Sequence, residues 1–420
     1  MARPTSKIQP DDVSTLALFR YRDFRIFWSG SFVSAMGTQF TSVAMAWQIY
    51  EITNSAFQIG LLGLVRAVPQ AMILLVGGLL ADAMNRRKLM MCTQISLFGV
   101  SCMLAWLTFS GRVSAGMLYV ATMLLAVFNS LENPSRQSII PNLVPREFMG
   151  RALALQSAQR YVSVIAGPSV AGIVLAIYGT TACYAVDAVS WLVMLVSLVL
   201  LKTKLQEGRG WGSVSLQSLR EGFSFVLRHG VLLPLMLLDC AATFFGNPRA
   251  LFPIYARDIL LVGPKGLGLL YASRAVGSFA SATLLSFFGP VRHGGRWVVL
   301  GVAVYGIATA LFAGSNVFWF SMIMLALSGA GDTTSAIVRN TINQLSTPDE
   351  LRGRMSSISS FFTSSGPQLG QFESGVVAAW LGAELSAMTG GLAVLVILAA
   401  VVAIFPVVAK FQIREDAAAT

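Results

Sequence analysis

Charged side chains are scarce in this chain of 420 residues: Lys, Arg, Asp and Glu together make up 12% of it. An ordinary soluble domain carries about 25%. Hydrophobic residues make up 55%, and the mean hydropathy is +0.69. Apolar runs of 18 or more residues recur from Ile26 to Val408. Each run can cross a hydrocarbon core about 30 Å thick, so the sequence predicts an all-α, polytopic membrane protein.

Residue types that carry covalent chemistry are also few. The chain has two histidines and four cysteines, and none of them has ligand spacing: His229, His293, Cys92, Cys102, Cys183 and Cys240. The motifs GxxxxGK[ST], HExxH and GxSxG do not occur in the sequence. These absences argue against an ATP-driven pump, a metal site and an enzyme. We therefore expect no cofactor.

The net charge of +11 lies in short links between apolar runs. A basic stripe with interleaved aromatic residues, which is typical of nucleic-acid binding, is missing. Anionic lipid is therefore the expected partner of this charge, and nucleic acid is not. The first 25 residues also lack an apolar stretch followed by a cleavage site. The first span is therefore expected to direct insertion itself.

The apolar runs predict twelve spans in two sets of six. The first set lies near 26–50, 56–81, 89–110, 115–137, 153–177 and 181–201. The second set lies near 231–255, 267–289, 298–315, 317–338, 356–380 and 386–408. We accordingly expect an amino-terminal bundle over 1–203, a cytoplasmic linker with an interfacial helix over 204–230, and a carboxy-terminal bundle over 231–420.

Basic residues predict the orientation of these spans. They concentrate in every second link: Arg86, Arg87, Lys88, Arg146, Arg151, Lys202, Lys204, Arg292, Arg296, Arg352, Arg354 and Lys410. The opposite links hold only Arg112, Arg257 and Lys265. Since cytoplasmic links carry the excess of Lys and Arg, both termini are expected in the cytoplasm.

An internal repeat relates the two sets. The segment starting at Val144 aligns without a gap on the segment starting at Thr347, so that Pro348 lies 203 positions after Pro145. The same offset pairs several glycine and arginine positions, among them Arg136 with Arg339. Copies separated by six spans share one orientation, which is a parallel repeat. The interface of the halves is the expected place of a binding site.

The link after the second span carries a recognisable motif. Gly78 is followed by Asp82 and then by the basic pair Arg86 and Arg87. This pattern resembles the signature loop of the major facilitator superfamily, although Ala83 stands where that loop usually has a basic residue. Gly78 would allow close helix contact, and Asp82 would cap a helix or pair with a base. An ordinary basic loop is the alternative.

The fifth span contains Gly167, Pro168 and Gly172. This segment is similar to the Gly-Pro motif of exporters in that superfamily, with plain helix packing as the alternative. Longer segments, such as FRYRDFRIFWSG and NPSRQSIIPNLVPREFMG, resemble its drug and siderophore exporter branch, which contains enterobactin exporters and macrolide efflux proteins. The resemblance covers nearly the whole chain.

The resemblance implies a proton-coupled exporter, or antiporter, of a small amphipathic molecule such as a siderophore or drug. It also implies a monomer in a bacterial cytoplasmic (inner) membrane. Cargo varies within the branch, so the sequence does not name it. An importer of a small organic solute is the second interpretation, and a transporter-like sensor without flux is the third.

Acidic residues inside the bilayer are candidates for proton coupling, because an ionisable side chain there costs several kcal/mol. In the superfamily fold, helices one, four, seven and ten line the cavity, which would place Glu132, Asp239 and Asp332 on the path. Asp239 is the first choice because its own helix offers no base one turn away. Glu132 has Arg136 at i+4, which favours a pair within the helix. Asp332 fits a proton site and a structural hydrogen bond equally.

Three basic residues inside predicted spans are candidates for substrate contacts or charge pairs. Arg66 lies in the second span, Arg160 in the fifth and Arg274 in the eighth. An arginine fork binds a carboxylate in two parallel hydrogen bonds. We therefore predict that the three arginines bias the cavity toward anionic or catechol-like cargo, with fixed salt bridges as the alternative.

Overall fold

The computed structural model describes residues 15–83, 86–203, 231–287, 292–347 and 349–412, without some of the side chains inside these ranges. Every regular element in these residues is a helix. The expected all-α fold is therefore confirmed. The expected interfacial helix over 204–230 lies outside the described residues.

The first half contains the helices α1 (Arg22–Thr53), α2 (Ala56–Ala83), α3 (Arg86–Phe109), α4 (Ala115–Leu143) and α5 (Met149–Leu200), with two short 3-10 turns, η2 (Thr15–Arg20) and η3 (Arg146–Phe148). The long helix α5 is two helices in sequence, because Gly179 has φ +77°. Only glycine adopts this left-handed conformation without a steric penalty. The break separates the expected fifth and sixth spans.

The second half begins with an interrupted span: α7 (Leu232–Phe245), η4 (Pro248–Leu251), α8 (Phe252–Ile254) and the π-helical turn η5 (Tyr255–Ile259). The helices that follow are α9 (Gly263–Phe287), α10 (Gly294–Ala313), α11 (Phe318–Leu345), α12 (Asp349–Leu381), α13 (Ala383–Ile404) and α14 (Val407–Lys410). The sequence predicted this span near 231–255 without identifying the interruption. Pro248 lacks the N–H that would continue the ladder of helix α7.

Each of the twelve expected spans has a helical counterpart in the described residues. Seven helices there are long and apolar enough to cross a membrane by length and composition: α2, α3, α4, α5, α10, α11 and α13. The other counterparts are interrupted, as in α7, or more polar, as in α12 with its many serines and glutamines. Such polar helices are expected where spans face a protein interior rather than lipid.

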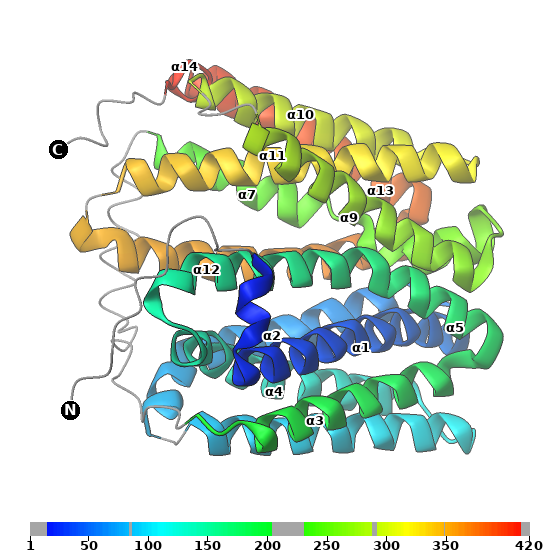
Figure 1. Ribbon diagram of the computed structural model, residues 1–420. Coiled ribbons are helices and arrows are strands. Elements are labelled where there is room, and N and C mark those ends of the chain that lie inside the picture. The colour runs from blue at the N-terminus through cyan, green and yellow to red at the C-terminus, as the bar shows by residue number, and fades with distance from the viewer. Residues whose placement is uncertain (1–14, 84–85, 204–230, 288–291, 348, 413–420) are drawn as a thin grey trace.

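The helices form two bundles, which lie one above the other in Figure 1. Within the first bundle α5 packs on α1 and α3, and within the second α10 packs on α11 and α13. The bundles meet where α2 packs on α12 and α5 packs on α9. One end of the molecule, called the linker end here, holds Leu200 and the start of α7 at Leu232. The far end holds the opposite links, including residues 54–55 and 260–262.

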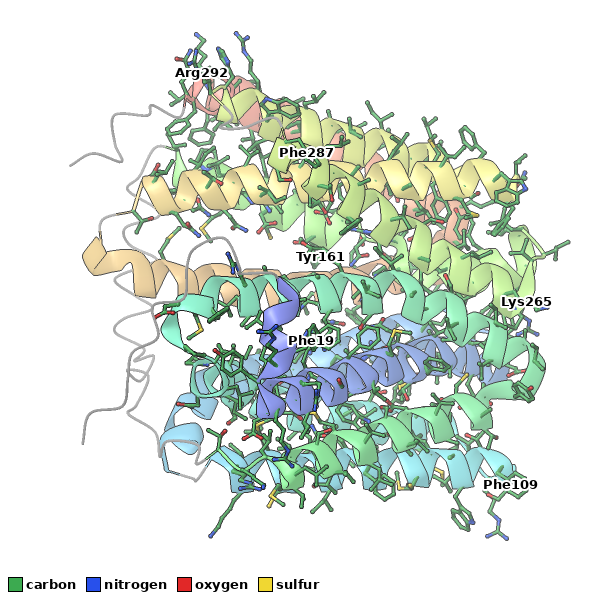
Figure 2. All side chains as sticks on the ribbon, in the orientation of Figure 1. Phe19, Phe109, Tyr161, Lys265, Phe287 and Arg292 are labelled. Carbon is green, nitrogen blue, oxygen red and sulfur yellow. The ribbon has the colours of Figure 1, made fainter. Side chains whose placement is uncertain are left out.

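Large apolar side chains are exposed on the outer faces of the bundles. Trp380 is 86% exposed, and Phe109 and Phe287 are 81% exposed. Figure 2 shows Phe109 pointing away from the helices at the lower margin of the first bundle. An outward apolar surface of this kind is the surface that lipid covers. The chain is therefore a multi-pass membrane protein.

Asp23, at the start of α1, holds the end of α5. One of its carboxylate oxygens accepts hydrogen bonds from the backbone N–H groups of Lys202 and Thr203, at 3.1 and 2.8 Å. Burial raises the pKa of Asp23, but these bonds and the Thr203 hydroxyl outweigh it and hold the pKa below its usual value. The carboxylate thus stabilises the fold above its unfolded pKa, and this contribution is lost as the pH falls through the folded pKa.

We expect Asp23→Asn to lower the free energy of unfolding by about 1 kcal/mol at neutral pH and to flatten its fall under acid conditions. Thermal unfolding in detergent between about pH 3 and pH 7 measures both effects. Glu51→Gln, at an exposed site, is the control. An unchanged acid profile in Asp23→Asn would contradict the prediction.

Candidate transport site

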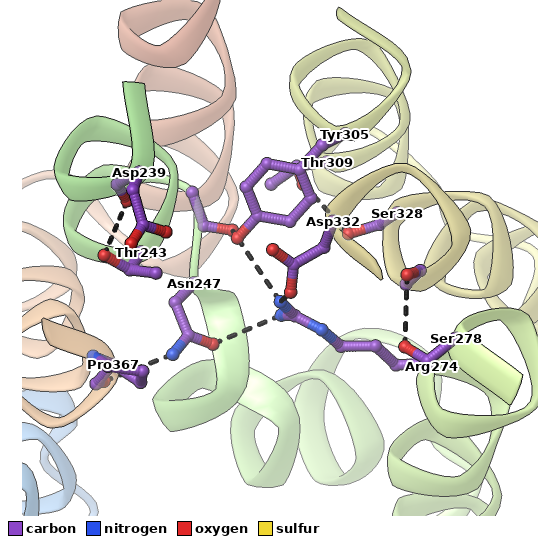
Figure 3. A network of polar contacts seen from close by, with 12 residues as sticks. Asp239, Thr243, Asn247, Arg274, Ser278, Tyr305, Thr309, Ser328, Asp332 and Pro367 are labelled. Carbon is purple, nitrogen blue, oxygen red and sulfur yellow. Dashed lines mark hydrogen bonds and ion pairs between the residues drawn. The ribbon is translucent and has the colours of Figure 1, made fainter. Parts of the chain in front are cut away.

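Arg274 on α9 is the centre of a polar network in the second half (Figure 3). Its guanidinium donates to Asp332 Oδ2 on α11 at 3.1 Å and to Asn247 Oδ1 at 3.3 Å. It also donates to the Tyr305 hydroxyl on α10 at 3.4 Å and lies 5.4 Å from the centre of that ring. Four segments of the second half are therefore tied to one cation.

The break in the seventh span supplies part of this network. The carbonyl of Gly246 accepts a hydrogen bond from the Tyr305 hydroxyl, and the carbonyl of Asn247 accepts one from Ser374 at 3.2 Å. The Asn247 amide donates to the carbonyl of Pro367 at 3.2 Å. Backbone groups freed inside a membrane protein need such partners. The carbonyls of Gly246 and Asn247 thus have partners on α10 and α12, and Asn247 lies beside Arg274.

A second ion pair joins α7 to α11. Arg339 Nη2 lies 2.5 Å from Asp239 Oδ1, and Arg339 Nη1 donates to Ser335 at 3.1 Å. In the first half, Arg136 Nη2 lies 2.8 Å from Glu132 Oε1, and Gln94 donates to the other oxygen at 2.7 Å. Arg136 and Arg339 occupy equivalent repeat positions. The carboxylate that pairs with Arg136 lies on the same helix, whereas the carboxylate that pairs with Arg339 lies on another helix. The two halves therefore share the position of the arginine but not that of its acidic partner.

Each predicted coupling carboxylate therefore has an arginine partner. The intrahelical pair of Glu132 and Arg136 is confirmed, since its atoms lie on one face of α4. Asp332 forms an ion pair with Arg274, which joins two of the predicted site residues. Asp239 is paired across helices with Arg339, a residue that the sequence interpretation passed over. The repeat offset that pairs Arg136 with Arg339 could have identified this residue.

The other predicted arginines lie apart from carboxylates. Arg66 is half-buried, and its nearest polar partner is the Met45 sulfur at 4.0 Å. Arg160 is exposed on α5, and among the described residues no carboxylate pairs with it. The sequence interpretation missed Arg249 in η4, whose charge interacts with those of Arg66 and Arg274. Arg66, Arg249 and Arg274 thus form one group of interacting charges, and Arg160 lies apart from it.

The predicted signature loop is only partly visible. The side chains of Gly78, Asp82 and Arg86 lie outside the described residues. Arg87 donates to the carbonyls of Leu198 and Val199, each at 3.1 Å. These carbonyls belong to the last turn of α5, where a cation also meets the negative end of the helix dipole. Arg87 thus ties the link between α2 and α3 to the sixth span.

The Gly-Pro segment of α5 packs closely against two helices. A Cβ on Gly167 would lie 2.5 Å from Gln39 Cγ of α1, and a Cβ on Gly172 would lie 2.6 Å from the Pro264 carbonyl and 3.0 Å from Gly268 of α9. Pro168 lies within α5, and its carbonyl is beside Gly268. These contacts support the packing interpretation of the motif, with Gly172 at the interface of the two halves.

We expect Gly172→Val to separate α5 from α9, because its side chain would collide with the α9 backbone rather than with a flexible group. The melting temperature in detergent should fall, by an amount that corresponds to about 1–3 kcal/mol of overpacking. Gly99→Ala is the control, since nothing lies within 4 Å of a Cβ there. Equal melting temperatures for the two variants would contradict this account.

Two helical bundles, which meet where α2 packs on α12 and α5 packs on α9, have the architecture of the major facilitator fold. Solved structures agree on this fold. A POT family transporter in complex with 5-aminolevulinic acid has a TM-score of 0.74 at 12% identity, covering 92% of this chain and 96% of that one. A bacterial homologue of the human lysosomal transporter Spinster, inward-facing and unoccupied, has a TM-score of 0.71 at 15% identity, covering 93% and 97%.

The chain belongs to the transmembrane secretion effector family of the major facilitator superfamily, whose model matches residues 13–419. The enterobactin exporter EntS of Shigella dysenteriae serotype 1 is 26% identical over 378 residues, which cover 89% of each chain. Macrolide efflux protein A of Streptococcus pyogenes is 21% identical over 365 residues, covering 86% of this chain and 90% of the relative. The protein is thus a transporter and not an enzyme.

Proposed function

We propose that the protein is a proton-coupled exporter that moves a small amphipathic molecule out of the cytoplasm across a bacterial cytoplasmic membrane. The observation that carries this proposal is the pair of carboxylate–arginine contacts in the second half, Asp239 with Arg339 and Asp332 with Arg274. The names of the relatives, an enterobactin exporter and a macrolide efflux protein, support export as the direction.

Asp239 is proposed as the proton carrier. In the ionised form it holds Arg339 and so ties α7 to α11. A proton that binds the Asp239 carboxylate removes its charge, and the ion pair is replaced by a weaker hydrogen bond from the charged guanidinium to a neutral carboxyl group. Release of Arg339 then frees α7 to move relative to α11.

Alternating access is proposed from the places where the halves touch. At the far end the Tyr50 hydroxyl donates to Asp258, and Arg257 donates to Asn54 Oδ1 at 2.9 Å. These four residues, called the far-end clamp here, join α1 and its C-cap to η5. Gly60 near the start of α2 also touches Gly375 near the end of α12. We assign the linker end and both termini to the cytoplasm from the basic links, so this state would be closed outside.

We expect Tyr50→Phe to open the far end in a larger share of molecules, because it removes the hydroxyl that Asp258 accepts. A hydrogen bond to a charged group contributes about 1.5–3 kcal/mol, which shifts a two-state ratio by about tenfold or more. Spin labels at Arg112→Cys and Val317→Cys, with the four native cysteines changed to alanine, report the distance between the halves.

Tyr178→Phe is the matched control, since Tyr178 is 71% exposed near the same end. The control should leave the distance distribution unchanged. If Tyr50→Phe also leaves it unchanged, the far-end clamp does not hold the halves together.

Export itself is tested by accumulation in energised cells. Cells that make the protein should retain less of at least one compound from a panel of catecholate siderophores, macrolides and lipophilic cations. A protonophore should abolish the difference. Higher accumulation in these cells would indicate an importer, and binding without any change in accumulation would indicate a sensor; either result overturns the proposal.

A further inference from the structure

Two arginines inside the bundle have no acidic partner among the described residues. Arg136, Arg274 and Arg339 each contact a carboxylate. Arg66 instead approaches the Met45 sulfur at 4.0 Å, and the guanidinium of Arg249 lies 5.8 Å from the centre of the Tyr271 ring. Both side chains are half-buried. Among the described residues, neither guanidinium therefore contacts a carboxylate.

These arginines lie on opposite sides of the junction between the two halves. Arg66 belongs to α2 of the first half, and Arg249 belongs to η4 of the second, on which α2 packs. The charge of Arg249 is repelled by those of Arg274 and Arg66 and attracted by that of Asp332. The Arg249 guanidinium lies over the Tyr271 ring, and the Tyr271 hydroxyl donates to the Arg249 carbonyl at 3.3 Å. One aromatic ring and two guanidinium groups therefore lie at this junction.

A bound anion would stabilise this arrangement. A guanidinium withdrawn from water loses hydration, and a like charge nearby adds repulsion. The contact with the face of the Tyr271 ring offsets only part of this free-energy cost, because a cation–π contact is weaker than a charge-assisted hydrogen bond. A planar oxyanion would remove the repulsion and accept paired hydrogen bonds from a guanidinium fork. The ring beside them offers an apolar face to an aromatic cargo.

We propose that Arg66 and Arg249, with Tyr271, bind the anionic group of an organic cargo, and that this group is a planar carboxylate. The inference rests on the proposed transport function and names its substrate class. It differs from the sequence prediction, because Arg249 replaces Arg160 and Arg274 is occupied by Asp332. An anion held by both arginines also connects the two halves of the transporter.

Binding is tested on the full chain in lipid nanodiscs by saturation-transfer NMR titration. Benzoate and 2,3-dihydroxybenzoate are the anionic probes, and benzamide is a neutral probe of nearly the same shape. We expect the anionic probes to bind at least tenfold more tightly than benzamide. Benzamide binding as tightly as benzoate, or no binding of either anion, would overturn the proposal.

Variants assign the binding to these residues. Arg66→Gln and Arg249→Gln should each weaken benzoate binding by about tenfold, the change expected on losing a charge-assisted hydrogen bond. They should also raise the melting temperature without ligand, since each removes an unpaired charge, whereas a purely structural arginine would lower it on removal. Arg112→Gln, in an exposed link, is the control and should change neither value. Benzoate affinity within twofold of the parent in both variants would overturn the assignment.

Arg249→Lys is the second variant to be tested if Arg249→Gln does not fold. It keeps the charge and removes the fork, so benzoate binding should weaken while the discrimination against benzamide persists. Parent-like benzoate affinity in this variant would contradict fork recognition. The outcome is separable from the transport function: anion binding without flux refutes transport and leaves the site, whereas flux without anion binding refutes the site alone.

Discussion

Replacing Arg274 with methionine is expected to lower the free energy of unfolding by about 2–4 kcal/mol. The substitution leaves the Asp332 carboxylate without its cation and removes a donor from Asn247 and Tyr305. The expected loss stays below that of a fully buried pair because 33% of the Asp332 side chain is exposed. Chemical unfolding of the detergent-solubilised chain measures the change.

A second substitution separates the ion pair from general packing. Arg274→Met together with Asp332→Leu removes both charges, and it should recover much of the lost stability because no unpaired charge remains. Arg160→Met is the control at an exposed site and should change the free energy of unfolding by less than about 0.5 kcal/mol. If the double variant is as unstable as Arg274→Met, the charge of Asp332 is not the cause.

Asp239→Asn is expected to uncouple transport from the proton gradient. The amide has nearly the shape of the carboxylate and can still accept a hydrogen bond from Arg339, so the fold should persist. It cannot bind and release a proton. Proton-driven export should fall by about tenfold or more, the size of effect typical for a positioned proton-transfer group. Exchange of labelled for unlabelled substrate, which needs no net proton movement, should continue.

Glu373→Gln provides the matched control for this experiment. Glu373 lies in α12, where it accepts a hydrogen bond from the Ser374 hydroxyl at 3.5 Å. Among the described residues, no arginine pairs with it. Export by Glu373→Gln should remain close to that of the parent. Full proton-driven export by Asp239→Asn at normal expression would remove Asp239 from the proton path.

Local features of the sequence predicted the parts of the fold that depend on neighbours along the chain. Span positions follow from the length of apolar runs, and the break at Gly179 follows from a glycine between two such runs. The pair of Glu132 and Arg136 follows from their i+4 spacing. In each case the interacting groups lie within one helix or one link, so their geometry is fixed by the helix itself.

Contacts between helices could not be predicted from local features of the sequence. The pair of Asp239 and Arg339 spans 100 positions, and that of Arg274 and Asp332 spans 58. Their formation depends on how α7, α9 and α11 pack, which one sequence does not state. The break in the seventh span did have a signal, because Gly246, Asn247 and Pro248 are consecutive. That signal was missed because the apolar run around them continues.

The sequence predicted arginines inside the bilayer, but it did not identify all of them. Arg66 and Arg274 were identified as cations inside the bilayer, which hydropathy alone suffices to find. Arg249 was missed, although it also lies inside an expected span and next to the helix break. A search for every arginine within a predicted span, rather than only those within uninterrupted runs, would have found it.

Substrate-dependent proton flux in liposomes tests the central claim, coupled export, most directly. The purified chain is reconstituted with an internal pH dye and given the same panel of catecholate siderophores, macrolides and lipophilic cations under an imposed substrate gradient. We predict that at least one compound drives a change in internal pH, with protons moving opposite to the substrate, and that this change is absent in Asp239→Asn. Substrate movement with no accompanying proton movement would contradict proton-coupled export.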